Sequence, residues 1–225
     1  MANYRADDVL AFWFGTGADY GKRHKRWFEK DAAFDSEITR RYLGLYEELS
    51  RNPTWLDSAP ECLGRILVLD QFPRQMFRGQ ARAFASDGPA LQAARLALER
   101  AYDRGLLPVE RMFVYLPFEH SESLADQQRA CALMQPLAAF PETDDVYRYA
   151  IAHRDIIQRF GRFPHRNSVL GRESTPEEVE FLLKWRVELN AMTSRQLIDF
   201  IERQFARYGV KKIGSSWDRV GDSRG

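Results

Sequence analysis

Apolar residues recur at intervals of three and four along most of the chain, which is the spacing of one buried face of an α-helix. One such face runs from Phe34 to Leu49 and stops before Pro53, and another runs from Val146 to Phe160. No comparable stretch alternates apolar and polar residues with a period of two, as the strands of a half-buried sheet do. The pattern therefore predicts an all-α fold.

Glycines, prolines and capping residues divide this pattern into roughly nine or ten helices of ordinary length. Ser58 with Glu61, and Thr175 with Glu178, are spaced as capping boxes at the start of two of them. The short connections predict antiparallel helix pairs stacked in a tetratricopeptide-like helical array. The expected helices cover residues 8–14, 20–29, 34–49, 59–72, 87–101, 109–116, 124–140, 145–160, 175–190 and 193–209.

The length of 225 residues suits one sizeable domain with a C-terminal addition. We expect residues 1–183 to form a single helical array domain and residues 184–209 to form an additional helical extension. Residues 210–225 are polar and glycine-rich, so they have few apolar side chains to bury. We therefore expect a disordered tail over these last residues.

Two charged residues interrupt the apolar face that begins at Leu63. Asp70 and Arg74 continue the helical spacing of Leu63 and Ile66, at positions where leucine is expected. Removing one member of a buried charged pair costs about 3–5 kcal/mol, so these residues need partners or a ligand. Pro73 lacks an amide proton, so we expect the helix to end or kink near residue 72 and to aim Arg74 into a cavity.

Other polar residues lie on apolar faces or in stretches that break the helical pattern. His153 occupies the apolar face of residues 146–160, and the stretches YLPFEHSES and GRFPHRNSVLGR cover residues 115–123 and 161–172. Guanidinium and imidazole groups that face one cavity bind carboxylates or phosphates. The candidate ligand-binding residues are Asp70, Arg74, Arg78, Tyr115, Glu119, His120, His153, Arg154, Arg162, His165, Arg166 and Asn167.

Three interpretations of these residues stay open at the level of sequence. In the first, a concave Arg- and His-lined site binds an anionic small molecule, or the acidic or carboxylate end of a protein partner. In the second, an enzyme uses the same pocket, with His120 or His153 as general base and Glu119 as its orienting residue. In the third, a scaffolding protein is held together by a network of buried ion pairs. The arginines assigned to the anion clamp are Arg74, Arg78, Arg154, Arg162 and Arg166.

Net charge and motifs narrow the classes of partner. The formal net charge of +1 gives no general attraction to nucleic acid. Although residues 159–166 interleave cations with aromatic rings, no nucleic-acid-binding motif is present, so we do not expect nucleic acid as a partner. Neither HExxH nor a Cys/His ligand spacing occurs, and Walker A and GxGxxG sequences are absent. We therefore expect neither a metal site nor a cofactor.

The sequence also indicates a cellular compartment. The N-terminal residues MANYRADD lack the cationic and apolar regions of a signal peptide. No apolar run approaches the roughly 20 residues that a membrane span needs. Cys62 and Cys131 are isolated from each other and from any ligand spacing, which is typical of buried thiols in a reducing compartment. We expect a soluble, cytoplasmic protein without a membrane partner.

Four stretches occur together in a distinctive order: VLAFWFG at 9–15, LDQFPRQMFRG at 69–79, YLPFEHSES at 115–123 and HRDIIQRFGRFPHRNSVLGRESTPEE at 153–178. Over about residues 8–183 the chain resembles a mainly bacterial family known as domain of unknown function 924. The resemblance implies an all-helical fold similar to tetratricopeptide-like arrays and a cytoplasmic protein, and it brings no activity or cofactor. From about residue 184 the chain departs from the family, so no role is carried over to that segment.

Overall fold

The computed structural model describes residues 4–189, 210–213 and 216–219. Their α-helices are α1 (Ala6–Phe14), α2 (Ala32–Arg51), α3 (Ala59–Ile66), α4 (Phe72–Met76), α5 (Asp87–Glu99), α6 (Pro108–Glu119), α7 (Leu124–Met134), α8 (Val146–Phe160) and α9 (Pro176–Leu189). The all-α prediction is confirmed, and the number of helices is close to the expected one. None of the helices in these residues is long and apolar enough to cross a membrane.

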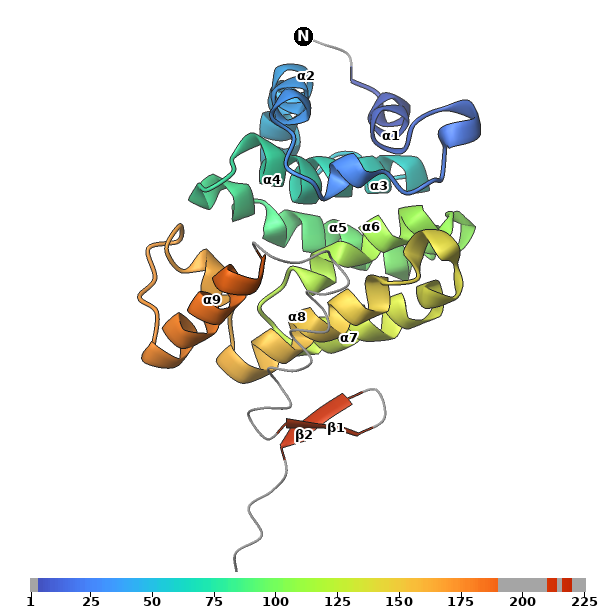
Figure 1. Ribbon diagram of the computed structural model, residues 1–225. Helices are drawn as coiled ribbons and strands as arrows, with labels where there is room; N and C mark the ends of the chain where they lie inside the picture. Colours follow the sequence, from blue (N-terminus) through green and yellow to red (C-terminus); the bar gives the residue numbers. More distant parts are fainter. Residues whose placement is uncertain (1–3, 190–209, 214–215, 220–225) are drawn as a thin grey trace, which may run out of the picture.

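The helices stack in successive layers, each on the one before it in the sequence (Figure 1). Helices α1 and α2 contact α3 and α4, α3 contacts α5, and α6 continues the stack to α7 and α8. Helix α9 lies to one side and contacts the short turn Pro164–Arg166. Such layering agrees with the expected stacking of helix pairs, whereas membership of the tetratricopeptide-like superfamily stays a prediction.

Capping residues start the helices where the sequence indicates. Ser58 accepts a hydrogen bond from the amide of Glu61 at the start of α3. At the start of α9, Thr175 accepts from the amide of Glu178 while the Glu178 carboxylate accepts from the amide of Thr175. Both groups satisfy amides that would otherwise lack a partner in the first turn. The two predicted capping boxes therefore differ, because only the second is reciprocal in the structure.

The expected helix over residues 20–29 is wrong, because only Lys25–Trp27 form a 3₁₀ turn there. Burial of Trp27 fixes this segment instead. Its ring stacks on Trp13 with 5.9 Å between centroids and meets the edge of Phe113 at 4.9 Å. Its indole N–H donates to the carbonyl of Trp13 at 2.9 Å. Aromatic packing between distant residues therefore positions Lys25 and Phe28 without a helix.

The predicted helix over 124–140 is also too long. Helix α7 ends at Met134 and a 3₁₀ turn, Gln135–Ala139, follows. Pro136 explains the change, since it has no amide proton to donate to the carbonyl four residues earlier. The expected helix over 193–209 lies outside the described residues.

A short antiparallel hairpin occupies part of the expected disordered tail. Strand β1 (Val210–Ile213) pairs with β2 (Ser216–Arg219), with Val210 opposite Arg219. The intervening sequence is Gly-Ser, a two-residue connection of the kind that favours hairpins, and β-branched and aromatic residues flank it. The expectation of a disordered tail over residues 210–225 stays a prediction.

Candidate functional site

The polar face that begins at Asp70 lies on an irregular part of a continuous helix. Helix α3 passes into a π-helical segment, Leu67–Gln71, and then into α4, in place of the end or kink predicted near residue 72. Pro73 has no amide proton for the carbonyl of Leu69, and the hydroxyl of Ser86 donates to that carbonyl at 2.6 Å. Short π-helical segments occur often at functional sites because they change the direction of their side chains.

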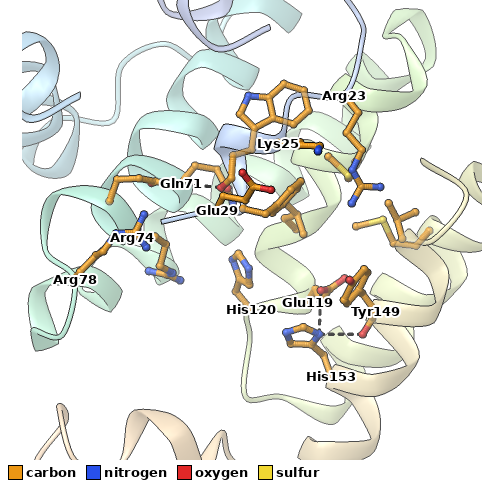
Figure 2. Close-up of a pocket in the computed structure, with 17 residues that line it drawn as sticks. Arg23, Lys25, Glu29, Gln71, Arg74, Arg78, Glu119, His120, Tyr149 and His153 are labelled. Atoms are coloured by element: carbon orange, nitrogen blue, oxygen red, sulfur yellow. Dashed lines mark hydrogen bonds and ion pairs between the residues drawn. The ribbon is translucent and has the colours of Figure 1, made fainter. Parts of the chain in front are cut away.

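The face lines a cavity of about 610 Å³ between α4, α6, α8 and the loop that follows α1 (Figure 2). Figure 2 shows Arg74 and Arg78 on one side, Arg23 and Lys25 on another, and His120 between them and the Glu119–His153 pair. The lining residues are Arg23, Lys25, Trp27, Phe28, Glu29, Gln71, Arg74, Gln75, Arg78, Met112, Leu116, Glu119, His120, Met134, Val146, Tyr149 and His153.

Asp70 lies behind the cavity wall and holds His120. Its side chain is fully buried, and its Oδ1 lies 2.6 Å from Nδ1 of His120. Gln71 donates to the other carboxylate oxygen at 2.6 Å, and Arg74 lies 4.0 Å away. Burial opposes ionisation of Asp70, but the contacts with His120, Arg74 and Gln71 outweigh it and lower the pKa of this carboxyl. Asp70 is therefore an ionised anchor for the His120 ring.

Glu119 and His153 form a second contact on the opposite wall. Nδ1 of His153 lies 3.1 Å from the Glu119 carboxyl group and 2.9 Å from the carbonyl of Tyr149 (Figure 2). Burial raises the pKa of Glu119 to about 8, and the charges of Asp70 and Asp145 add to the effect. The surrounding protein lowers the pKa of His153, because burial disfavours the imidazolium ion. At pH 7 this pair is therefore a neutral carboxylic acid beside a neutral imidazole.

The cationic side chains of the cavity differ in how firmly they are held. Arg78 donates to both carboxylate oxygens of Asp35, at 2.5 and 2.9 Å. Arg74 donates to Asp87 at 2.7 Å and also to the carbonyl of Ala83. Lys25 is exposed and forms no ion pair with a described residue, so its ammonium group is available to a ligand.

Arg23, on the same side of the cavity as Lys25, contacts the carboxylate of Asp145. Neither Asp145 nor the partners of the other two arginines, Asp35 and Asp87, line the cavity. The carboxylates therefore approach the arginines from behind the cavity wall. Each arginine is held in one orientation while part of its guanidinium group faces the cavity.

The structure brings five of the twelve predicted site residues to the cavity wall, namely Arg74, Arg78, Glu119, His120 and His153. Asp70 contributes from behind it. Arg166 lines a neighbouring cavity of about 340 Å³ that shares His120, and it shares Asp87 with Arg74. Burial lowers the pKa of Arg166 to about 10, against the charge of Asp87.

The other five predicted residues, Tyr115, Arg154, Arg162, His165 and Asn167, do not line the main cavity. The hydroxyl of Tyr115 donates to Asp103 at 2.7 Å, and Arg154 donates to its neighbour Asp155. Arg162 and Asn167 both donate to Glu178 at the start of α9. His165 is exposed, with its ring centroid 5.5 Å from that of Phe163.

Two cationic lining residues, Arg23 and Lys25, were missed by the sequence analysis. They belong to the stretch KRHKRWFEK over residues 22–30, in which cations surround two aromatic residues. The same interleaving drew attention to residues 159–166, so it was a usable signal here as well. Among the described residues, no group of three or more His, Cys, Asp or Glu side chains is placed to hold a metal ion.

Comparisons with known proteins agree with the fold. The family described as "bacterial protein of unknown function (DUF924)" matches residues 9–185. A solved structure of a protein of unknown function, ATU0120 from Agrobacterium tumefaciens, is 44% identical, with a TM-score of 0.70 over 79% of this chain and 96% of that chain. No curated protein matches the chain. The match over residues 9–185 covers most of the sequence, and the chain therefore belongs to the DUF924 family of bacterial proteins.

Proposed function

We propose that this protein binds a small organic anion, one that carries a carboxylate or phosphate group, in the 610 Å³ cavity. The observation that carries the proposal is the excess of positive charge on the lining residues. Four cations line the cavity, Arg23, Lys25, Arg74 and Arg78, whereas Glu29 and Glu119 are the carboxyl groups among the lining residues. Since Glu119 has a pKa of about 8, Glu29 is the lining carboxyl group that is ionised at pH 7, while Asp35, Asp87 and Asp145 pair with the arginines from behind the wall.

The arrangement of the arginines suits recognition rather than simple charge. Arg78 is fixed by two hydrogen bonds to Asp35, and Arg74 by its bonds to Asp87 and Ala83. A guanidinium group has five N–H donors, so these contacts leave donors for a ligand. Because these arginine side chains are already ordered, they lose less conformational entropy when a ligand binds. Lys25 adds an exposed cation to the cavity lining.

The size of the cavity supports a small-molecule ligand. Pockets for such ligands typically have volumes of about 300–1,000 Å³ and combine apolar walls with a few polar groups. Here Trp27, Met112, Leu116 and Met134 supply apolar wall. The carboxylate end of a protein partner has the same chemistry as a free carboxylate, so a short peptide belongs among the probes in the test.

The test is a thermal-shift and calorimetric titration with inorganic phosphate, citrate, small mono- and dicarboxylates, and a tripeptide with a free carboxylate. We expect at least one probe to raise the melting temperature of the wild-type protein, and Lys25→Glu to weaken its binding by at least about tenfold, or 1.4 kcal/mol. The matched control is Lys22→Glu, which makes the same charge change at an exposed position outside the cavity.

Equal losses of affinity in Lys25→Glu and Lys22→Glu would contradict the proposal, because the effect would then reflect overall charge. Binding of the tripeptide alone would assign the site to a protein partner. The scaffolding interpretation predicts that no probe binds and that the lining cations serve only their carboxylates.

Catalysis is the second candidate function, and one observation favours it. The buried carboxylate of Asp70 lies 2.6 Å from the imidazole of His120, whose ring lines the cavity. A carboxylate in this position orients a histidine that exchanges protons with a bound molecule.

A further inference from the structure

Both cavity histidines have Nδ1 engaged by an acceptor of the protein. For His120 the acceptor is the ionised carboxylate of Asp70. For His153 it is the backbone carbonyl of Tyr149, with the neutral carboxyl group of Glu119 nearby. Among the described residues, none forms a hydrogen bond or ion pair with Nε2 of either ring. Figure 2 shows the second ring nitrogen of His153 turned away from Glu119 and Tyr149.

These contacts fix the tautomer of His120. An ionised carboxylate can only accept hydrogen bonds, so the nitrogen of His120 that faces Asp70 must carry the proton. The neutral ring then has its lone pair on Nε2. The short 2.6 Å contact, the burial of Asp70 and the hydrogen bond from Gln71 hold the ring in one orientation.

The same reasoning applies to His153, whose Nδ1 lies 2.9 Å from the backbone carbonyl of Tyr149. A carbonyl oxygen is an acceptor only, so Nδ1 donates and Nε2 keeps the lone pair. The two histidines nevertheless differ in their neighbours. Only His120 faces an ionised carboxylate that can stabilise an imidazolium ion after proton uptake.

The chemistry of the lining residues narrows the type of reaction. No Ser, Thr or Cys is among the described residues that line the cavity. The two cysteines are buried, and burial raises the pKa of each thiol to about 11. A serine, threonine or cysteine nucleophile is therefore not available among the described lining residues, whereas an oriented base and several fixed cations are.

We propose that His120 is a general base that removes a proton from the carbon next to the carbonyl group of a small oxo-carboxylate, with Asp70 as its positioning residue. The proposal rests on the anion-binding function proposed above. Nε2 takes the proton, and the electron pair of the broken C–H bond moves to give an enolate with its charge on the carbonyl oxygen. Return of the proton from the imidazolium ion to carbon restores both the ligand and His120, so atoms and charge balance.

The cationic lining residues have two roles in this step. They hold the carboxylate group of the ligand, and they stabilise the negative charge that develops on the enolate oxygen. Their fixed orientation matters, because Arg74 and Arg78 are already held by Asp87 and Asp35 before the ligand binds. Asp70 contributes by stabilising the imidazolium ion that forms when His120 takes the proton.

Proton exchange in heavy water tests the proposal directly. Pyruvate, 2-oxobutyrate and 2-oxoglutarate are incubated with the protein in D₂O, and loss of the C3 proton signals is followed by NMR. We expect the wild-type protein to accelerate exchange of at least one probe and His120→Asn to reduce the rate by about 10²–10⁴-fold. His165→Asn, a histidine change outside the cavity, should exchange at the wild-type rate.

Asp70→Asn separates a positioning role from a structural one. An amide can donate to Nδ1 as well as accept from it, so it no longer fixes the proton there. We expect the ¹⁵N spectrum of His120 to show protonated Nδ1 in the wild-type protein and a shift toward protonated Nε2 in Asp70→Asn, together with slower exchange. A slower rate with an unchanged tautomer would overturn the assigned role of Asp70.

The possible failures are distinguishable. If a probe stabilises the wild-type protein in the thermal-shift assay but no probe exchanges faster, the proton-transfer proposal is overturned and anion binding stands. If exchange is fast and persists in His120→Asn, the assignment of the base is wrong. If no probe binds or exchanges, the proposed function fails together with this inference.

Discussion

Glu178→Ala should lower the free energy of unfolding by about 1–3 kcal/mol, because it leaves the buried amide of Asn167 and the backbone amide of Thr175 without their acceptor. The Glu178 side chain is 2% exposed, and its two oxygens accept from Arg162 at 2.7 and 2.8 Å. It also accepts from Asn167 and from the amide of Thr175. These contacts connect the loop after α8 to the start of α9. Urea denaturation followed by circular dichroism measures the change.

An exposed ion pair provides the matched control. Glu37 pairs with Arg41 on α2, and the two side chains are 44% and 39% exposed, so Glu37→Ala should cost less than about 1 kcal/mol. Equal effects of the two substitutions would contradict the account, since they would mean that the Arg162–Glu178 contact is no more important than a surface ion pair.

Glu119→Gln should flatten the dependence of stability on pH between 7 and 8. In this window the folded protein retains a proton on Glu119, whose pKa is about 8, while the unfolded chain, with an ordinary value of 4.5, has released it. A state that binds more protons loses relative stability as pH rises, so the free energy of unfolding of the wild-type protein falls by up to about 1.4 kcal/mol per pH unit. Glutamine cannot ionise and should remove this contribution.

The window is chosen to exclude His153, the hydrogen-bonded neighbour of Glu119. Its pKa is lowered from 6.5 in the folded protein, so above pH 7 it is mostly neutral in both states. Urea titrations at several pH values measure the slope, and Glu177→Gln, a change at an exposed carboxylate, should retain the wild-type slope. Identical slopes in Glu119→Gln and the wild-type protein would show that Glu119 is ionised in the folded state.

Periodic apolar spacing predicted the fold wherever one helix face packs on its neighbours. Helix α2 buries Phe34, Ile38 and Leu49 as the spacing indicates. The method failed for residues 20–29, where stacking of Trp27 on Trp13 decides the conformation. Contacts between residues so far apart leave no periodic signal in the local sequence.

The sequence indicated which residues were candidates for the site better than it indicated which of them contact each other. Charged groups on apolar faces pointed to Asp70 and His153, and both have partners in the structure, as a buried face requires. From the sequence, Glu119 is expected to orient the general base, either His120 or His153. In the structure Asp70 holds His120 while Glu119 contacts His153, because residues 119 and 120 are adjacent on one helix and point in different directions.

Contacts of the kind that the structural-network interpretation expects lie in a separate part of the molecule. Arg162 and Asn167 meet at Glu178, and Arg154 pairs with Asp155, all away from the main cavity. The sequence pattern does not distinguish these residues from those of the cavity. Both kinds of arginine lie on apolar helix faces or in stretches that break the helical pattern. Only the three-dimensional placement of their carboxylates separates the two groups.

Anomalous diffraction from crystals soaked in selenate tests the central claim, that the cavity is an anion-binding site, most directly. Selenate has the shape and charge of sulfate, and its selenium atom is located without reference to the protein. The account predicts a selenium peak inside the cavity, within hydrogen-bond distance of Lys25 or of the free donors of Arg74 and Arg78. Selenium peaks only at surface arginines, with none in the cavity, would contradict it.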